Sequence, residues 1–185
     1  MAKFITQKEK DADLFTVELA ALLHDIADWK FHKGDDTVSS KVAEEWLKNL
    51  GIDQKTINHV SEIARHISFK GAKVKNEIQT KEGEIVQDAD KLDAIGAIGI
   101  ARTFATGSKF GRIIFDPDEK PVIHTTFKQY KKSASSSINH FYEKTSFIKG
   151  YDEYRNREKA CHKKTRIHGK ILKGIFPRME RGNID

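Results

Sequence analysis

Apolar residues dominate residues 14–27 on every side of a helix, a pattern typical of a helix buried in a core rather than lying on a surface. Three polar side chains interrupt the end of this run: His24, Asp25 and Asp28. Buried groups of this kind cost free energy unless they are paired, hydrogen-bonded or bound to a metal. The pattern leaves two interpretations open: a core histidine satisfied by a carboxylate, or part of a metal site.

Helical periodicity also marks the next two segments. Ser39 or Ser40 can cap a helix whose apolar face includes Trp46 and Leu50. Asp53 can cap a following helix, in which apolar residues again recur at helical spacing.

A second long helix is predicted over residues 85–104. Gly96 and Gly99 lower its helix propensity, and we expect them to let a neighbouring helix approach closely. Residues 107–121 are rich in loop-forming residues, with room for a short β-hairpin, and another helix is expected to start at Ile138. The predicted fold class is all-α.

Three aspartates enter this second long helix. Asp88 has an alternative role as a helix N-cap, and Asp93 one as an exposed residue. Asp90 is framed by Ala89, Leu92 and other apolar neighbours, so an exposed position explains it less well.

Length and composition favour a single cytoplasmic domain. The chain has 185 residues, enough for a real core. No apolar run approaches the ~18–20 residues of a membrane span, and no signal peptide precedes the domain, so no membrane partner is expected. The single Cys161 excludes an internal disulfide and a cysteine-built zinc site.

The net charge of +6 is concentrated in the last part of the chain. Residues 145–185 hold 11 of the 33 Lys/Arg and 5 of the 27 Asp/Glu, so residues 1–144 are neutral. The body of the protein therefore lacks the positive charge typical of a nucleic-acid-binding domain.

His24, Asp25 and Asp90 are the side chains best suited to hold an ion. Mixed histidine and carboxylate ligands serve a divalent cation, and a carboxylate-rich set favours Mg²⁺, Mn²⁺ or Fe over zinc. On one helix, adjacent residues point about 100° apart, so His24 and Asp25 share an ion only if it lies between their directions.

These residues resemble the HD-domain metal-dependent phosphohydrolases, most closely the small stand-alone bacterial branch that includes nucleotide pyrophosphohydrolases. The similarity spans most of residues 11–144 and rests on His24-Asp25, Asp28, the Asp90 helix and Ser68-Phe69-Lys70-Gly71. It implies an HD-domain helical bundle with one divalent metal, held by a histidine, the His-Asp pair and a later aspartate.

The resemblance also implies roles for individual residues. His24, Asp25 and Asp90 match three metal ligands, and Asp28 matches an acid that orients or activates the attacking water together with Asp25. Plausible substrate contacts are Lys70, Arg102 and His140, with solvated surface positions as the alternative for each.

Two departures from the family pattern stand out. No histidine precedes His24, so we expect the family's first helix and its ligand to be lacking from the HD domain of residues 1–144. His32 or His66 is a conceivable substitute, although a loop or surface role suits each better. A core face left uncovered by that helix would favour self-association.

The resemblance stops after Lys144, and residues 145–185 show no sustained apolar face. Our hypothesis is that this atypical basic segment is translated in a shifted reading frame, which translation of the coding DNA in the other frames would test. The alternative is an authentic basic tail that binds nucleic acid, which its few aromatic residues disfavour.

The sequence therefore predicts hydrolysis of a nucleotide or other phosphate ester or anhydride by a metal-activated water, with activity reduced by the missing ligand. The alternative is an inactive helical HD-domain remnant that binds a nucleotide or a protein partner.

Overall fold

The computed structural model describes residues 1–9, 11–71 and 73–144, and every regular element in these residues is helical. The all-α fold class is thereby confirmed. The described residues form two compact units, one of Met1–Phe69 with Lys75–Asp90 and one of Lys70–Val74 with residues 91–144. The reading-frame hypothesis for residues 145–185 falls outside the described residues, and the boundary after residue 144 stays a prediction.

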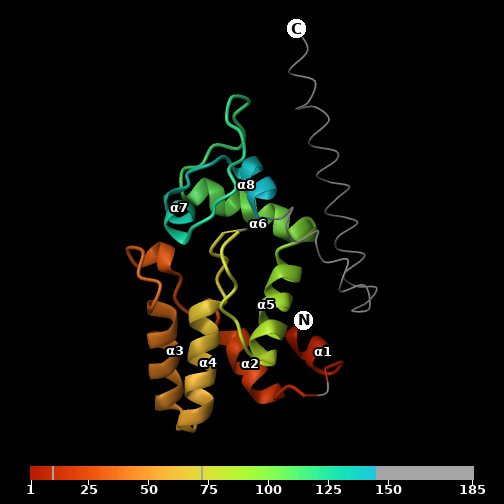
Figure 1. Ribbon diagram of the computed structural model, residues 1–185, viewed down its shortest axis with the longest axis vertical. Coiled ribbons are helices and arrows are strands. Elements are labelled where there is room, and N and C mark those ends of the chain that lie inside the picture. The colour runs from red at the N-terminus through yellow and green to blue at the C-terminus, as the bar shows by residue number, and fades with distance from the viewer. Residues whose placement is uncertain (10, 72, 145–185) are drawn as a thin grey trace. The chain divides into compact units, whose positions relative to one another are not determined.

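The first unit is a group of helices around one apolar core. Helix α4 contacts both α3 and α2, and α2 in turn contacts α1 (Figure 1). Helix α5 joins them where Gly83 lies against Ile63 of α4. The elements are α1 (Ala2–Thr6), α2 (Leu14–Leu23), the 3-10 helix η1 (Trp29–Phe31), α3 (Val38–Asn49), α4 (Gln54–His66) and α5 (Lys81–Asp93).

Side-chain caps set the start of two of these helices. The Asp53 carboxylate accepts a hydrogen bond from the Thr56 backbone N–H at 3.0 Å, which confirms the predicted cap of α4. Asp13 caps α2 in the same way. The predicted serine cap of α3 is wrong, because that helix begins at Val38 and the buried Ser39 hydroxyl donates to the Ala64 carbonyl of α4 at 3.1 Å.

The predicted apolar face of α3 is only partly correct. Ala43 and Leu47 are the residues that this helix buries in the core, whereas Trp46 and Leu50 are exposed. A helix that packs on one neighbour buries a narrow stripe, and these two residues lie outside it.

Helix α2 differs from its prediction in length and in burial. It ends at Leu23 rather than at residue 27, so His24 and Asp25 lie on the turn that follows. Val17 and Ala20 are fully buried, but Phe15 is exposed and Leu22 is 77 % exposed. The neighbouring helices therefore cover only part of the apolar surface of α2.

The predicted helix over residues 85–104 is two helices, α5 and α6 (Gly96–Lys109). Gly96 has φ +89°, a left-handed conformation that ends helical continuity and that residues with a Cβ disfavour. At Gly99 a Cβ would lie 2.1 Å from the Ala94 carbonyl oxygen. The glycines thus serve the chain's own turn, and at Gly99 the atoms nearest an added Cβ belong to Ala94 rather than to a neighbouring helix.

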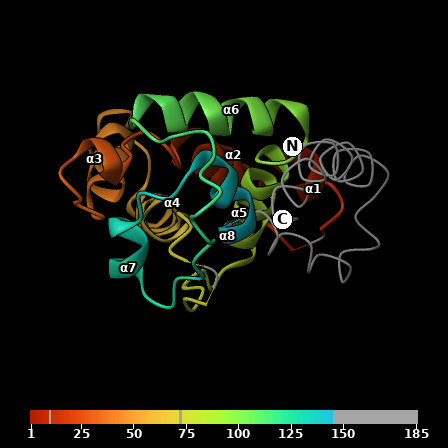
Figure 2. The same cartoon turned by 90° about the horizontal axis from the view of Figure 1, so that it is seen from above.

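In the second unit, α8 (Ser137–Glu143) packs against α6 (Figure 2). The rings of Phe104 and Phe141 lie 5.8 Å apart. The short β-hairpin predicted for residues 107–121 does not form. The carbonyls of Ile113 and Ile114 accept hydrogen bonds from the first N–H groups of α8 at 2.9 and 3.0 Å, which takes the place of strand pairing.

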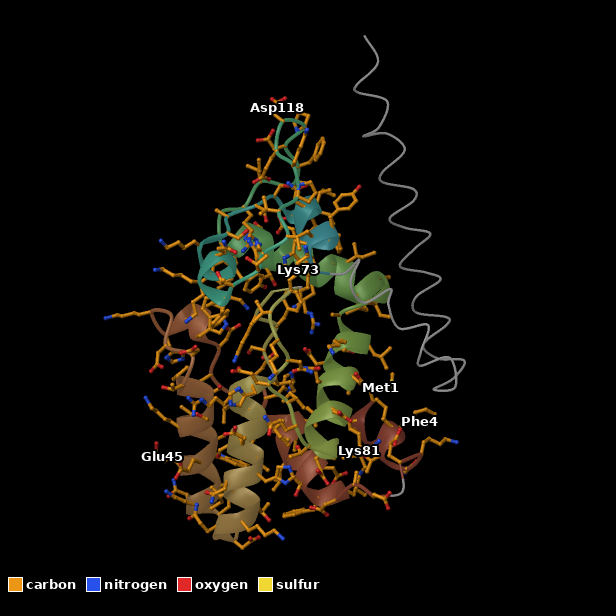
Figure 3. All side chains as sticks on the ribbon, viewed as in Figure 1. Met1, Phe4, Glu45, Lys73, Lys81 and Asp118 are labelled. Atoms are coloured by element: carbon orange, nitrogen blue, oxygen red, sulfur yellow. The ribbon has the colours of Figure 1, made fainter. Side chains whose placement is uncertain are left out.

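Glu45 on α3 and Asp118 in the loop after α6 are exposed charged residues, and their side chains extend into solvent (Figure 3). In the part of the chain that the structure describes, no helix is long and apolar enough to span a bilayer.

Candidate metal centre

His24 occupies the end of α2, where the last carbonyl groups of a helix lack intrahelical partners. Its ring Nδ1 lies 2.8 Å from the Ala21 carbonyl oxygen. A carbonyl oxygen can only accept, so Nδ1 donates to it and carries the hydrogen. The neutral ring then has its lone pair on Nε2, the atom left for other partners.

Two carboxylates flank this nitrogen. His24 Nε2 lies 3.5 Å from Asp25 Oδ2 and 3.8 Å from Asp90 Oδ1. Asp25 follows His24 on the turn, and Asp90 comes from α5. The three residues predicted as metal ligands are thus brought together within the first unit.

The two carboxylates raise the pKa of His24 to about 9. Asp90 has the largest effect, and at 3.8 Å it acts as a charge partner rather than through a hydrogen bond of ordinary length. Burial opposes the shift, and Asp25 and the Ala21 carbonyl add to it. Without a metal, the two carboxylates therefore stabilise a positive charge between them, and the protonated His24 ring provides it.

The raised pKa predicts how metal-free protein responds to pH. Protonation of His24 stabilises the folded chain fully below its unfolded pKa near 6.5, and this contribution is lost as pH rises through about 9. With the ring 24 % exposed, we expect a loss of about 1–2 kcal/mol. Urea unfolding in EDTA at pH 6 and pH 9.5 measures it. His24→Gln should flatten the difference, and an equal difference in that variant would contradict the assignment.

The donor chemistry of the site fits a divalent cation. One neutral imidazole and two carboxylates form a mixed set that suits Mn²⁺, Mg²⁺ or Fe. Ligand atoms about 2.1 Å from a common ion lie about 3 Å apart, slightly closer than found here. Consistently, no three His, Cys, Asp or Glu side chains among the described residues already form a metal-binding group. Asp25, with its side chain 72 % exposed, has space to adjust.

Asp28 is held at the start of η1. Its carboxylate accepts the Lys30 backbone N–H at 2.9 Å and the Lys30 ammonium at 2.8 Å. The sequence prediction did not include Lys30, although an aspartate two residues before a lysine at a helix start is a recognisable capping arrangement. Each of these contacts uses one carboxylate oxygen, and each oxygen keeps a further lone pair for another partner.

Lys70, Arg102 and His140 all belong to the second unit, whereas the His24 cluster belongs to the first. The Lys70 ammonium lies 5.8 Å from the centre of the Phe127 ring. Arg102 faces Asp93 at 3.5 Å, and both side chains are largely exposed. His140 is half-buried on α8. Their assignment as substrate contacts stays a prediction.

His66 and His32 differ in their surroundings. His66 Nε2 lies 3.0 Å from Glu62, and Nδ1 lies 2.9 Å from Glu77. Carboxylates therefore face both ring nitrogens, which favours a structural role. His32 follows η1 and is exposed.

Comparison with known proteins gives consistent relatives. The HD domain family model matches residues 1–95. The uncharacterised protein YpgQ of Bacillus subtilis is 40 % identical over 127 residues, which cover 67 % of this chain and 60 % of YpgQ. The chain thus spans about 60 % of the length of this curated relative.

Solved structures share the fold. A Lactobacillus plantarum protein has a TM-score of 0.74 at 29 % identity, covering 97 % of this chain and 82 % of that one. An HD-superfamily hydrolase from Bacillus thuringiensis has a TM-score of 0.56 at 31 % identity, covering 100 % and 82 %. YpgQ in complex with ADP has a TM-score of 0.64 at 28 % identity, covering 96 % and 82 %.

This chain therefore combines an all-α fold with a His-Asp pair that lies beside an aspartate of a later helix. This chain belongs to the HD domain family.

Proposed function

We propose that this chain hydrolyses a phosphate ester or anhydride, with a nucleotide as the substrate class. The observation that carries the proposal is the placement of His24 Nε2 between Asp25 and Asp90, at 3.5 and 3.8 Å, with Nδ1 already committed to Ala21. The complex of the related YpgQ with ADP supports a nucleotide as the ligand.

His24, Asp25 and Asp90 are the residues that would hold a Mn²⁺, Mg²⁺ or Fe ion. Such an ion would lower the pKa of a bound water molecule and neutralise negative charge on the phosphate. Asp25 and Asp28 orient the attacking water, and Asp28 accepts its proton.

Substrate binding falls to Lys70, Arg102 and His140 in this proposal. The cationic groups of Lys70 and Arg102 and the imidazole of His140 can contact phosphate oxygens, and Arg102 would exchange its exposed pairing with Asp93 for that contact. Only three metal donors are proposed, so we expect turnover below that of a relative with a complete ligand set.

The alternative is an inactive module that binds a nucleotide or a protein partner. Exposed apolar residues on α1 and α2, among them Phe4 and Leu22, favour it, and they would also promote self-association. Phe4 stands out from α1 in Figure 3.

The test is incubation of purified protein with nucleoside triphosphates and Mn²⁺, Mg²⁺ or Fe²⁺, with phosphorus NMR of the products. Metal-dependent release of phosphate or pyrophosphate that EDTA stops supports hydrolysis. Binding of ADP without turnover of any substrate supports the inactive module. Neither turnover nor binding contradicts both.

A further inference from the structure

Glu82, in the first turn of α5, joins that helix to the start of α2. Its Oε1 accepts a hydrogen bond from the Asp13 backbone N–H at 2.9 Å, although 69 positions separate the two residues in the sequence. Asp13 is the N-cap residue of α2. In a capping box the third residue of the same helix accepts this N–H, but here that residue is Thr16, whose hydroxyl donates to the Asp13 carboxylate. Glu82 of a second helix therefore completes the cap of α2.

A third helix holds the start of α5 at the same point. Oε2 of Glu82 lies 3.6 Å from Nε2 of His59 on α4, and that nitrogen lies 3.0 Å from the Thr80 hydroxyl oxygen. The Thr80 hydroxyl oxygen also accepts the Gly83 N–H at 3.3 Å. The Glu82 side chain is 13 % exposed, so water competes little for its carboxylate.

An ion pair lies next to this hydrogen bond in the sequence of α5. The Lys81 ammonium lies 2.8 Å from Glu9 Oε2. Lys81, labelled in Figure 3, is the first residue of α5, and Glu9 lies in the segment that leads into α2. This pair is more exposed than Glu82, and exposed ion pairs contribute little. The buried carboxylate of Glu82 is therefore the stronger link between the two helices.

The same two helices meet again at the candidate metal centre. Asp13 directly precedes α2 and His24 directly follows it, whereas Glu82 and Asp90 lie in the first and last turns of α5. At the far end, His24 Nε2 lies 3.8 Å from Asp90 Oδ1. Both helices therefore run from the hydrogen bond between Glu82 and Asp13 toward the candidate ligands.

Apolar packing alone fixes the position of α5 along its axis only loosely. Helix α2 packs on α4, and α5 meets α4 where Gly83 lies against Ile63. Apolar contacts are non-directional, whereas a hydrogen bond weakens steeply away from its preferred geometry. A displacement of α5 by one residue, about 1.5 Å, would take Asp90 out of its place beside His24.

We propose that Glu82 is a positioning residue for the candidate metal centre. Its hydrogen bond to the Asp13 N–H fixes the axial position of α5 against α2, and with it the separation of His24 and Asp90. The inference rests on the proposed function in one respect, that these last two residues bind a divalent cation. The hydrogen bond requires an acceptor oxygen at position 82 but not a negative charge.

The experiment is calorimetric titration of the full chain with Mn²⁺, compared with three variants. E82A removes the acceptor, E82D keeps the charge but shortens the side chain by one methylene group, and E82Q keeps the acceptor without the charge. We expect E82A and E82D to bind Mn²⁺ about tenfold more weakly, and E82Q to stay within about threefold of the unchanged chain.

The matched control is S39A, which removes a hydrogen bond between two other helices of the same unit. The buried Ser39 hydroxyl donates to the Ala64 carbonyl at 3.1 Å and joins α3 to α4, neither of which carries a proposed ligand. Urea unfolding measures how far each variant is destabilised. We expect S39A to be destabilised and yet to bind Mn²⁺ as the unchanged chain does.

Nitrogen NMR of the histidine rings in EDTA gives a readout that needs no metal. E82A and E82D should shift the His24 ring resonances, because Asp90 then lies elsewhere, and S39A should leave them in place. If the unchanged chain bound no Mn²⁺, the proposed function would fail, and these resonances would still decide whether Glu82 positions Asp90.

Three results would overturn the proposal. They are unchanged His24 resonances in E82A and E82D, equal weakening of Mn²⁺ binding in E82Q, and equal weakening in S39A. If E82A does not fold, E82D decides in its place. None of these results removes a proposed ligand, so the hydrolytic proposal stands even where the positioning role fails.

Discussion

Asp90→Asn is expected to lower metal-dependent hydrolysis by about a hundredfold or more. The substitution keeps the shape of the side chain but removes the charge that lies 3.8 Å from His24 Nε2. A divalent cation then loses one of its two carboxylate donors, and the ring loses the largest cause of its raised pKa. Initial rates at saturating Mn²⁺ and calorimetric Mn²⁺ affinity measure both consequences.

The matched control is Asp93→Asn on the same helix. Asp93 is exposed, and its carboxylate pairs with Arg102 at 3.5 Å rather than with His24. We expect Mn²⁺ affinity close to that of the unchanged chain. If both substitutions reduce Mn²⁺ affinity equally, a general loss of negative charge, and not a specific ligand, explains the effect.

Gly99→Ala is expected to lower the free energy of unfolding by about 2–4 kcal/mol. The added Cβ would lie 2.1 Å from the Ala94 carbonyl oxygen, which is backbone and cannot move aside without shifting the turn between α5 and α6. Urea unfolding followed by circular dichroism measures the loss.

Gly111→Ala separates crowding from backbone strain. Gly111 has φ +67° and no atom within 4 Å of an added Cβ, so only the left-handed conformation opposes the substitution. We expect a cost of about 1 kcal/mol there. Gly99 lacks a left-handed φ, so a loss at Gly99 no larger than that at Gly111 would contradict the severe crowding inferred there.

Local signals were sufficient to predict much of the fold. The buried face of α4 and its Asp53 cap followed from apolar spacing and one side chain, because both effects act within a few residues. The end of α2 could not be found in this way, since apolar residues continue beyond Leu23. The break at Gly96 was hidden for the same reason.

The candidate site was predictable in composition but not in detail. His24, Asp25 and Asp90 stood out because polar groups in apolar segments need partners. The orientation of His24 depends on the Ala21 carbonyl, and the Asp28 carboxylate is held by the Lys30 ammonium. These contacts arise only once helix ends are defined.

The hydrogen bond from His24 Nδ1 to the Ala21 carbonyl leaves Nε2 as the atom that can bind a metal. This hydrogen bond forms only because α2 ends at Leu23. If α2 continued for one more turn, that carbonyl would instead accept the backbone N–H four residues later, and the ring would lose its fixed tautomer. A relative could therefore lose activity through drift in helix length while retaining every site residue. Comparisons of HD-domain sequences would then miss the loss of activity, because the residues at the site would be unchanged.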